Sequence, residues 1–148
     1  MEHGIIEDVI ITPLSIIKGE KGDIYKVLTS AETGFNGFGE AYFSTIYFGE
    51  IKGWKKHSKM LLNITVPIGH IRFYIYDDRT ASKSFDIQMQ VDISQSSINY
   101  KRLTIPPGLW VAFEGIGNPT NLLLNIANII HDPSEAYSET LEHIKILR

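Results

Sequence analysis

The chain has 148 residues, 43% of them hydrophobic and 21% charged, with a formal net charge of −3. This composition is typical of a globular protein and excludes a disordered chain, and the length predicts one domain over residues 1–148. The acidic balance and the scatter of the 14 Lys and Arg residues argue against a nucleic-acid partner, because nucleic-acid-binding proteins concentrate basic charge on one face.

Cysteine is absent, which excludes disulfides, thiolate metal ligands and thiol redox chemistry. The chain begins with Met1, Glu2, His3 and Gly4 and has no basic segment followed by an apolar one. No apolar run approaches the roughly 20 residues of a membrane span. We therefore expect a cytoplasmic protein without a membrane partner.

The N-terminal third predicts short strands separated by turns and loops. Residues 5–17 are rich in β-branched side chains but are interrupted by Pro13, which cannot donate to a strand ladder. Two glycines within residues 19–23 predict a turn, and three glycines within residues 32–40 predict a loop. Strands are expected after these two segments, at residues 24–28 and 41–48.

The middle of the chain carries the strongest alternation. Residues 60–66 and 70–76 flank Pro67, Ile68 and Gly69, and this pattern predicts a hairpin. The tail from Pro133 onward, with Ser134, Glu135 and Glu139, predicts a short helix. Further strands are expected at residues 85–93, 101–105, 109–113 and 121–130.

Strands that recur regularly between turn signals, with hardly any helix, predict an all-β protein rather than a βαβ fold. The pattern is compatible with a sandwich, a barrel or a jelly roll, and does not choose among them.

Three motifs are similar, in order and spacing, to motifs of the dTDP-4-dehydrorhamnose 3,5-epimerase family. Residues 50–57 (EIKGWKKH) resemble the family's arginine-glycine-leucine-histidine strand start. Residues 69–79 resemble its glycine, hydrophobic strand and aspartate-x-arginine, and residues 103–108 (LTIPPG) resemble its IPPG turn. Residues 131–135 (HDPSE) lie where family members end their last barrel strand, so the resemblance covers most of the chain. It implies a cupin jelly-roll barrel with a short C-terminal helix, forming a homodimer and needing no cofactor.

Several active-site positions of the family hold other residues here. Lys55 occupies the position of the catalytic histidine, with His57 two residues further on, and Asn125 occupies that of the catalytic tyrosine. Epimerisation beside a ketone needs a base and an acid on opposite sides of the sugar ring. The family's catalytic histidine and catalytic tyrosine are both replaced in this chain. The second active-site histidine aligns with Val111, the family's lysine with Leu62, its N-terminal arginine-glycine pair with Lys21-Gly22 and its substrate-contacting glutamate with Lys26.

His57 and Lys55 form the candidate catalytic pair. If their segment is a strand, their i, i+2 spacing points both side chains to the same face, into the barrel. His57 would then act as acid or base, and Lys55 as an electrostatic clamp for an enolate or phosphate oxygen. The alternative is a solvated turn of lysines and histidine.

The candidate substrate-binding residues are Lys21, Lys26, Asn63, Arg72, Tyr74, Arg79 and Asn125. Arginines bind diphosphates bidentately and tyrosines stack on a base or sugar, as a nucleotide-sugar site requires. The alternative for the central residues is the exposed face of a half-buried sheet. Trp54, Trp110, Phe113 and the aromatic strand at 42–48 are expected in the core or a dimer interface.

A metal site is not expected. Metal-binding cupins use two histidines at i, i+2, a glutamate soon after them and a third, distant histidine. Lys55 replaces the first of these histidines, and no glutamate follows before Gly69.

These patterns predict a homodimeric cupin that binds a dTDP-linked 4-keto-deoxyhexose and acts as an epimerase or isomerase in deoxysugar or surface-polysaccharide biosynthesis. One alternative is a non-catalytic cupin that binds a nucleotide sugar or a partner enzyme, without solvent deuterium uptake beside the keto group. A structural interaction module, which would bind no nucleotide sugar, is the other.

Overall fold

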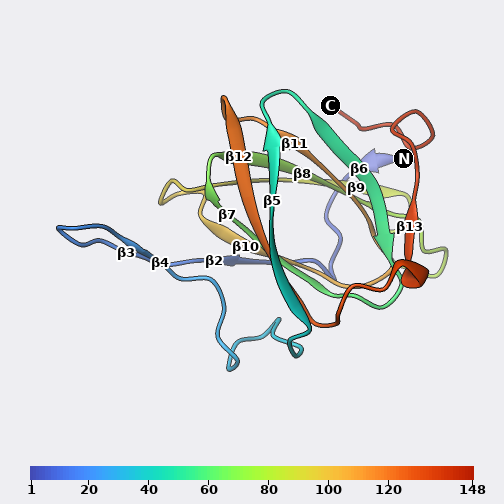
Figure 1. Ribbon diagram of the computed structural model, residues 1–148. Coiled ribbons are helices and arrows are strands. Elements are labelled where there is room, and N and C mark those ends of the chain that lie inside the picture. Colours follow the sequence, from blue (N-terminus) through green and yellow to red (C-terminus); the bar gives the residue numbers. More distant parts are fainter.

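Two sheets face each other in the computed structural model, which describes residues 1–148 (Figure 1). The first, in spatial order, contains β1 (Glu2–His3), β9 (Ile87–Ser94), β8 (His70–Asp77), β11 (Trp110–Gly115), β6 (Ile51–His57) and β13 (Ala136–Ser138). The second contains β2 (Ile10–Pro13), β10 (Lys101–Ile105), β7 (Leu62–Ile68), β12 (Thr120–Ala127) and β5 (Glu40–Tyr47). All pairings within the sheets are antiparallel except that of β1 with β9. The prediction of an all-β fold is confirmed.

The main hydrophobic core fills the space between the two sheets. Every second residue of β8, namely Ile71, Phe73 and Ile75, is completely buried there. Val66 of β7 and Leu103 of β10 are equally inaccessible on the facing sheet. Each such side chain stabilises the fold by about 1.5–3 kcal/mol relative to exposure, so this double layer holds the sheets together.

The hairpin predicted for residues 60–76 is wrong, because its two strands belong to different sheets. β7 pairs with β10 and β12, whereas β8 pairs with β9 and β11. Gly69, at φ +91°, turns the chain from one sheet to the other, and the side chain of Asn121 accepts a hydrogen bond from the His70 backbone at 2.8 Å. The alternation of apolar and polar residues predicts which side chains face the core, but it does not predict which sheet each strand joins.

The tail forms a single turn of 3₁₀ helix, Pro133–Glu135, and then continues as strand β13. The side chain of Asp132 caps the turn by accepting from the Ser134 backbone, and Pro133 suits a first helical position. The chain then pairs with β6, Ala136 lying opposite His57, and this pairing takes the place of further helix. The predicted short helix is therefore limited to one turn.

A second buried cluster lies on the outer side of the six-stranded sheet, beneath the C-terminal segment. It contains Trp54, Tyr74, Trp110 and Ile144. The Trp54 indole donates a hydrogen bond to the Ile144 carbonyl at 2.8 Å, which fixes the tail across the sheet. No helix is long and apolar enough to cross a membrane.

A two-stranded hairpin, β3 (Ile16–Ile17) and β4 (Ile24–Tyr25), projects away from both sheets (Figure 1). Ile17 is 51% exposed and Ile24 is 59% exposed. The hairpin therefore presents apolar side chains outside the body of the chain.

Candidate functional site

A cavity of about 400 Å³ lies between the sheets at the end where β5 is the edge of one sheet and β13, paired with β6, is the edge of the other. One wall comes from β6, β11 and β13, and the other from β5, β7 and β12. Apolar side chains make up about half of the lining, while Lys52, Lys55, His57, Tyr42 and Asn125 supply polar groups. A mainly apolar hollow with a few convergent polar groups is the usual form of a small-molecule site.

His57, at the end of β6, is held by a buried carboxylate. Its Nδ1 lies 2.6 Å from Glu135 Oε2, and Glu135 is only 2% exposed. The other oxygen of Glu135 accepts hydrogen bonds from the Lys59 and Met60 backbone N–H groups, at 3.1 and 2.7 Å. The 3₁₀ turn of the tail therefore fixes the ring of a residue that lies far from it in sequence.

Glu135 is charged in this arrangement. Burial disfavours its ionised form, but the hydrogen bonds from His57, Met60 and Lys59 outweigh burial and hold the pKa of Glu135 below its usual value. A carboxylate can only accept, so the His57 proton lies on Nδ1. In the neutral imidazole Nε2 then carries a lone pair, and no residue of the chain bonds to it. The cavity thus contains a nitrogen able to accept a proton.

Two lysines bring positive charge to the same wall. Lys55 and His57 occupy alternate positions of β6, and both line the cavity, as the predicted strand requires. Lys55 makes no ion pair within the chain. The ammonium of Lys52 donates to the Thr45 carbonyl at 2.5 Å and lies 5.9 Å from the centre of the Phe113 ring. A bound anion would therefore meet two cations, although the carboxylate of Glu139 also lines the cavity.

Asn125 and Tyr42 occupy the opposite wall as neighbours on β12 and β5. The Asn125 amide NH₂ donates to the Tyr42 hydroxyl at 3.0 Å, and its Oδ1 accepts from the Asn63 backbone at 3.1 Å. The structure thus brings Lys55, His57 and Asn125 together among the predicted site residues. Their roles remain predictions.

The other predicted substrate-binding residues do not line this cavity. Asn63 points to the outer face of its sheet, where its NH₂ donates to the Gly34 carbonyl at 2.9 Å. Arg72 binds Asp92 in a fork at 2.8 and 3.0 Å, and Tyr74 lies buried in the outer cluster. Lys21 lies in the turn of the projecting hairpin, and Lys26 directly follows it.

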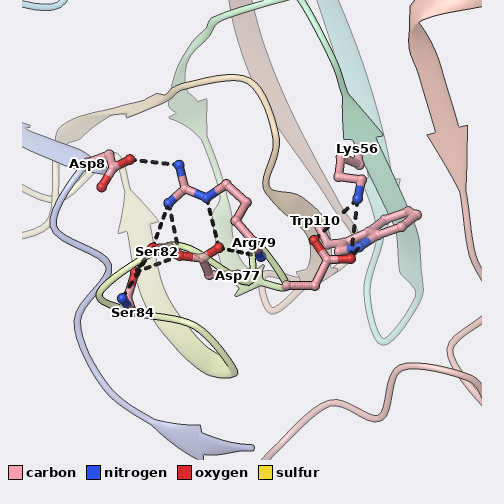
Figure 2. Close-up of polar contacts among 8 residues, drawn as sticks. Asp8, Lys56, Asp77, Arg79, Ser82, Ser84 and Trp110 are labelled. Atoms are coloured by element: carbon pink, nitrogen blue, oxygen red, sulfur yellow. Dashed lines mark hydrogen bonds and ion pairs between the residues drawn. The ribbon is translucent and has the colours of Figure 1, made fainter.

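Arg79 also lies away from the cavity, in a cluster of its own (Figure 2). It binds the buried Asp77 through Nε at 2.8 Å and Nη2 at 2.9 Å, and Asp8 through Nη1 at 2.8 Å. Ser82 and Ser84 each donate to Asp77 at 2.6 Å. Burial alone would raise the pKa of Asp77, but these bonds hold it far below its usual range. The cluster joins the end of β8 to the N-terminal segment.

Sequence reasoning missed Glu135, Tyr42 and Lys52 as members of this site. Glu135 entered only as the last residue of the 131–135 motif and as part of the tail, and Tyr42 as one aromatic residue of a strand. An acidic residue after the last strand was the available signal for Glu135. Only the pairing of β13 with β6 brings this residue next to His57. Nowhere do three or more His, Asp or Glu side chains gather in a metal-binding arrangement.

Two facing sheets with a mainly apolar cavity between their edges define this protein as a cupin of the jelly-roll class. No model of a known protein family matches the chain, and no curated protein sequence matches it. The structure of a dTDP sugar isomerase from Desulfovibrio desulfuricans G20 has a TM-score of 0.88 and 32% identity, over 91% of this chain and 85% of that chain. The chain therefore belongs to the RmlC-like family of dTDP-sugar epimerases and isomerases, as its motifs predicted.

More distant structures share the fold. The dTDP-6-deoxy-D-glucose-3,5-epimerase RmlC of Legionella pneumophila Philadelphia 1, solved with dTDP-4-keto-L-rhamnose, has a TM-score of 0.79 and 20% identity over 92% of this chain and 74% of its own. The dTDP-4-dehydrorhamnose 3,5-epimerase of Sulfolobus tokodaii has a TM-score of 0.81 and 17% identity, over 93% and 80%.

Proposed function

We propose that this protein binds a dTDP-linked 4-keto-6-deoxy sugar between its sheets and moves protons at carbons beside the keto group, as an epimerase or isomerase. The observation that carries the proposal is His57, whose Nδ1 is held by Glu135 at 2.6 Å while Nε2 is open to the cavity. The protein would serve deoxysugar or surface-polysaccharide biosynthesis in the cytoplasm.

The chemistry follows from the position of these groups. Nε2 of His57 accepts a proton from the carbon beside the ketone, and the C–H electron pair moves to the ketone oxygen as an enolate. Glu135 stabilises the imidazolium that forms, because its negative charge lies against Nδ1. Lys55 offers positive charge to the enolate or to a diphosphate oxygen. The step transfers protons only, so it needs no redox cofactor.

The binding half of the proposal is tested by differential scanning fluorimetry. A ligand that binds only the folded chain raises its melting temperature by mass action. We expect a rise with dTDP and none with ADP at the same concentration. Equal shifts with both nucleotides would contradict a dTDP-specific site.

The catalytic half is tested with dTDP-4-keto-6-deoxyglucose in D₂O, followed by proton NMR. We expect deuterium at one or both carbons beside the keto group at a rate that depends on enzyme concentration. Binding of the sugar without deuterium uptake would instead support the second candidate, a non-catalytic cupin. Two residues favour that candidate. Asn125 and Val111 occupy positions at which the dTDP-4-dehydrorhamnose 3,5-epimerase family has its catalytic tyrosine and its second active-site histidine.

We also propose that residues 1–148 are a single domain that forms a homodimer. Exposed apolar side chains support this assembly. Phe43 and Ile68 are 66% and 55% exposed, and Ile17 and Ile24 are exposed on the projecting hairpin. A role for Lys21 or Lys26 in ligand binding would require a second chain, since neither lines the cavity of its own. Sedimentation velocity should give twice the monomer mass, and a monomer at micromolar concentration would contradict the proposal.

A further inference from the structure

The two walls of the cavity come from different sheets, so a sugar between them presents opposite faces to each. His57 lies on β6 of the six-stranded sheet, and Tyr42 lies on β5 of the five-stranded sheet. Inverting a carbon requires that a proton leave from one face and that another return from the other. If the chemistry proposed above is an epimerisation, it therefore needs an acid on the wall opposite His57.

The side chains that line this opposite wall are Tyr42, Ser44, Leu62, Ile64, Leu123 and Asn125. The three aliphatic side chains carry no exchangeable proton. The hydroxyl of Ser44 and the amide of Asn125 form hydrogen bonds but do not ionise in the range in which protein side chains titrate. Only the Tyr42 phenol can give up a proton as a general acid.

Asn125 orients this phenol. Its Oδ1 accepts a hydrogen bond from the Asn63 backbone, so the amide cannot rotate without losing that bond, and its NH₂ faces Tyr42. The phenol oxygen is thus an acceptor in its bond with Asn125, which leaves the phenolic proton free to point at a ligand. An N–H group aimed at this oxygen also stabilises the phenolate left after proton transfer.

We infer that Tyr42 is the general acid that protonates the enolate on the face opposite His57, with Asn125 as its positioning residue. His57 takes the proton from carbon, the Tyr42 O–H bond breaks as a new C–H bond forms on the other face, and the enolate returns to the ketone. The phenolate then regains a proton from water and the imidazolium releases one. This inference rests on the proposed function and deepens it, because it makes the product a sugar inverted at carbon.

The test compares Tyr42→Phe with Tyr47→Phe in D₂O with dTDP-4-keto-6-deoxyglucose. Tyr47 lies on the same strand, is 69% exposed and bonds to nothing through its hydroxyl, so its variant controls for loss of a phenol. In Tyr42→Phe we expect inverted product to fall at least 100-fold. Deuterium should still enter the recovered starting sugar, because His57 can return a solvent proton to the face from which it took one. Tyr47→Phe should match the wild type.

A second variant tests the role of Asn125. Asn125→Asp keeps an oxygen for the Asn63 backbone but replaces the donor NH₂ with an acceptor that binds the phenolic proton. We expect the same separation of exchange from inversion, with product reduced about tenfold at neutral pH. Its recovery at lower pH, where the new carboxyl is protonated, would distinguish positioning from a merely structural role.

The outcomes separate the inference from the proposed function. If the wild type takes up no deuterium although it binds the sugar, the catalytic function is overturned and the inference with it. If the wild type inverts the sugar and Tyr42→Phe does so at an equal rate, the inference alone is overturned. Loss of deuterium uptake together with product in Tyr42→Phe would overturn the division of roles between Tyr42 and His57. Retained melting-temperature shifts with dTDP show that each variant still folds and binds.

Discussion

The Asp77–Arg79 cluster and the His57–Glu135 pair each join a buried carboxylate to a basic side chain, but they differ in what remains unpaired. Asp77 accepts from Arg79, Ser82 and Ser84, and the third guanidinium nitrogen of Arg79 goes to Asp8 (Figure 2). Both carboxylate oxygens of Glu135 likewise accept hydrogen bonds, yet His57 keeps Nε2 open to the cavity. A saturated network stabilises the fold, whereas a network with one open atom presents that atom to a ligand.

The largest expected effect comes from removing that open atom. His57→Ala should lower turnover of dTDP-4-keto-6-deoxyglucose by about 10²–10⁴-fold, the usual contribution of a general base. Proton NMR measures product and deuterium uptake together. The melting-temperature shift with dTDP should persist, because the lysines remain. Full turnover in His57→Ala would remove this residue from the mechanism.

Breaking the saturated network should cost stability rather than activity. Asp77→Ala leaves Arg79 with only Asp8 as an ionic partner, and removing one member of a buried pair costs about 3 kcal/mol. Urea unfolding at pH 7 measures the loss. A change in dTDP affinity without a change in stability would contradict the structural role of this cluster.

The third change tests the charge on Glu135. Glu135→Gln replaces a charged acceptor of three hydrogen bonds and should lower the free energy of unfolding by about 2 kcal/mol at pH 7. The native pKa of Glu135 is lowered, so its stabilisation is present above the unfolded pKa and is lost as pH falls through the folded value.

The difference between wild type and Glu135→Gln should therefore shrink as the pH falls below the ordinary carboxyl value of 4.5. Urea unfolding at pH 7 and pH 4 measures both differences. A gap of the same size at both values would show that the charge of Glu135 contributes nothing.

The smallest effect concerns ligand charge. Lys55→Ala should weaken dTDP binding about tenfold at low ionic strength and less in high salt, because a partly exposed ion pair is screened. Lys56→Ala is the matched control: Lys56 lies on the other face of β6, bound to Asp78 at 3.2 Å. Isothermal titration calorimetry of both variants with dTDP measures the difference. Equal losses would show that net charge, rather than position, sets the affinity.

Much of the fold could be predicted from the sequence, because alternation and turn residues are local signals. The strands at 41–48 and 101–105 occur almost as expected. The assignment of strands to sheets could not be predicted, since Gly69 can turn a chain back on itself or carry it to a facing sheet. The extent of the helix in the tail could not be predicted for a related reason, because β6, the strand with which the tail pairs, is remote in sequence.

The site was partly predictable because i, i+2 spacing on a strand places Lys55 and His57 on one face. Glu135 and Tyr42 depend on the register of remote strands, which alternation does not contain. Arg72 and Arg79 have guanidinium groups that could bind a diphosphate. In the structure, however, Arg72 binds the carboxylate of Asp92 and Arg79 binds that of Asp77. Residue type alone could not distinguish arginines that bind carboxylates of the protein from arginines that bind a ligand.

The position of Glu135 after the last strand of the barrel has a consequence for biosynthesis on the ribosome. All strands that form the two cavity walls except β13 precede Glu135 in the sequence, and the ribosome synthesises the chain from its N-terminal end. A nascent chain can therefore pair every wall strand other than β13 before the carboxylate that holds His57 has emerged. The capacity to bind would arise first, and the orientation of the base would follow when the tail joins β6.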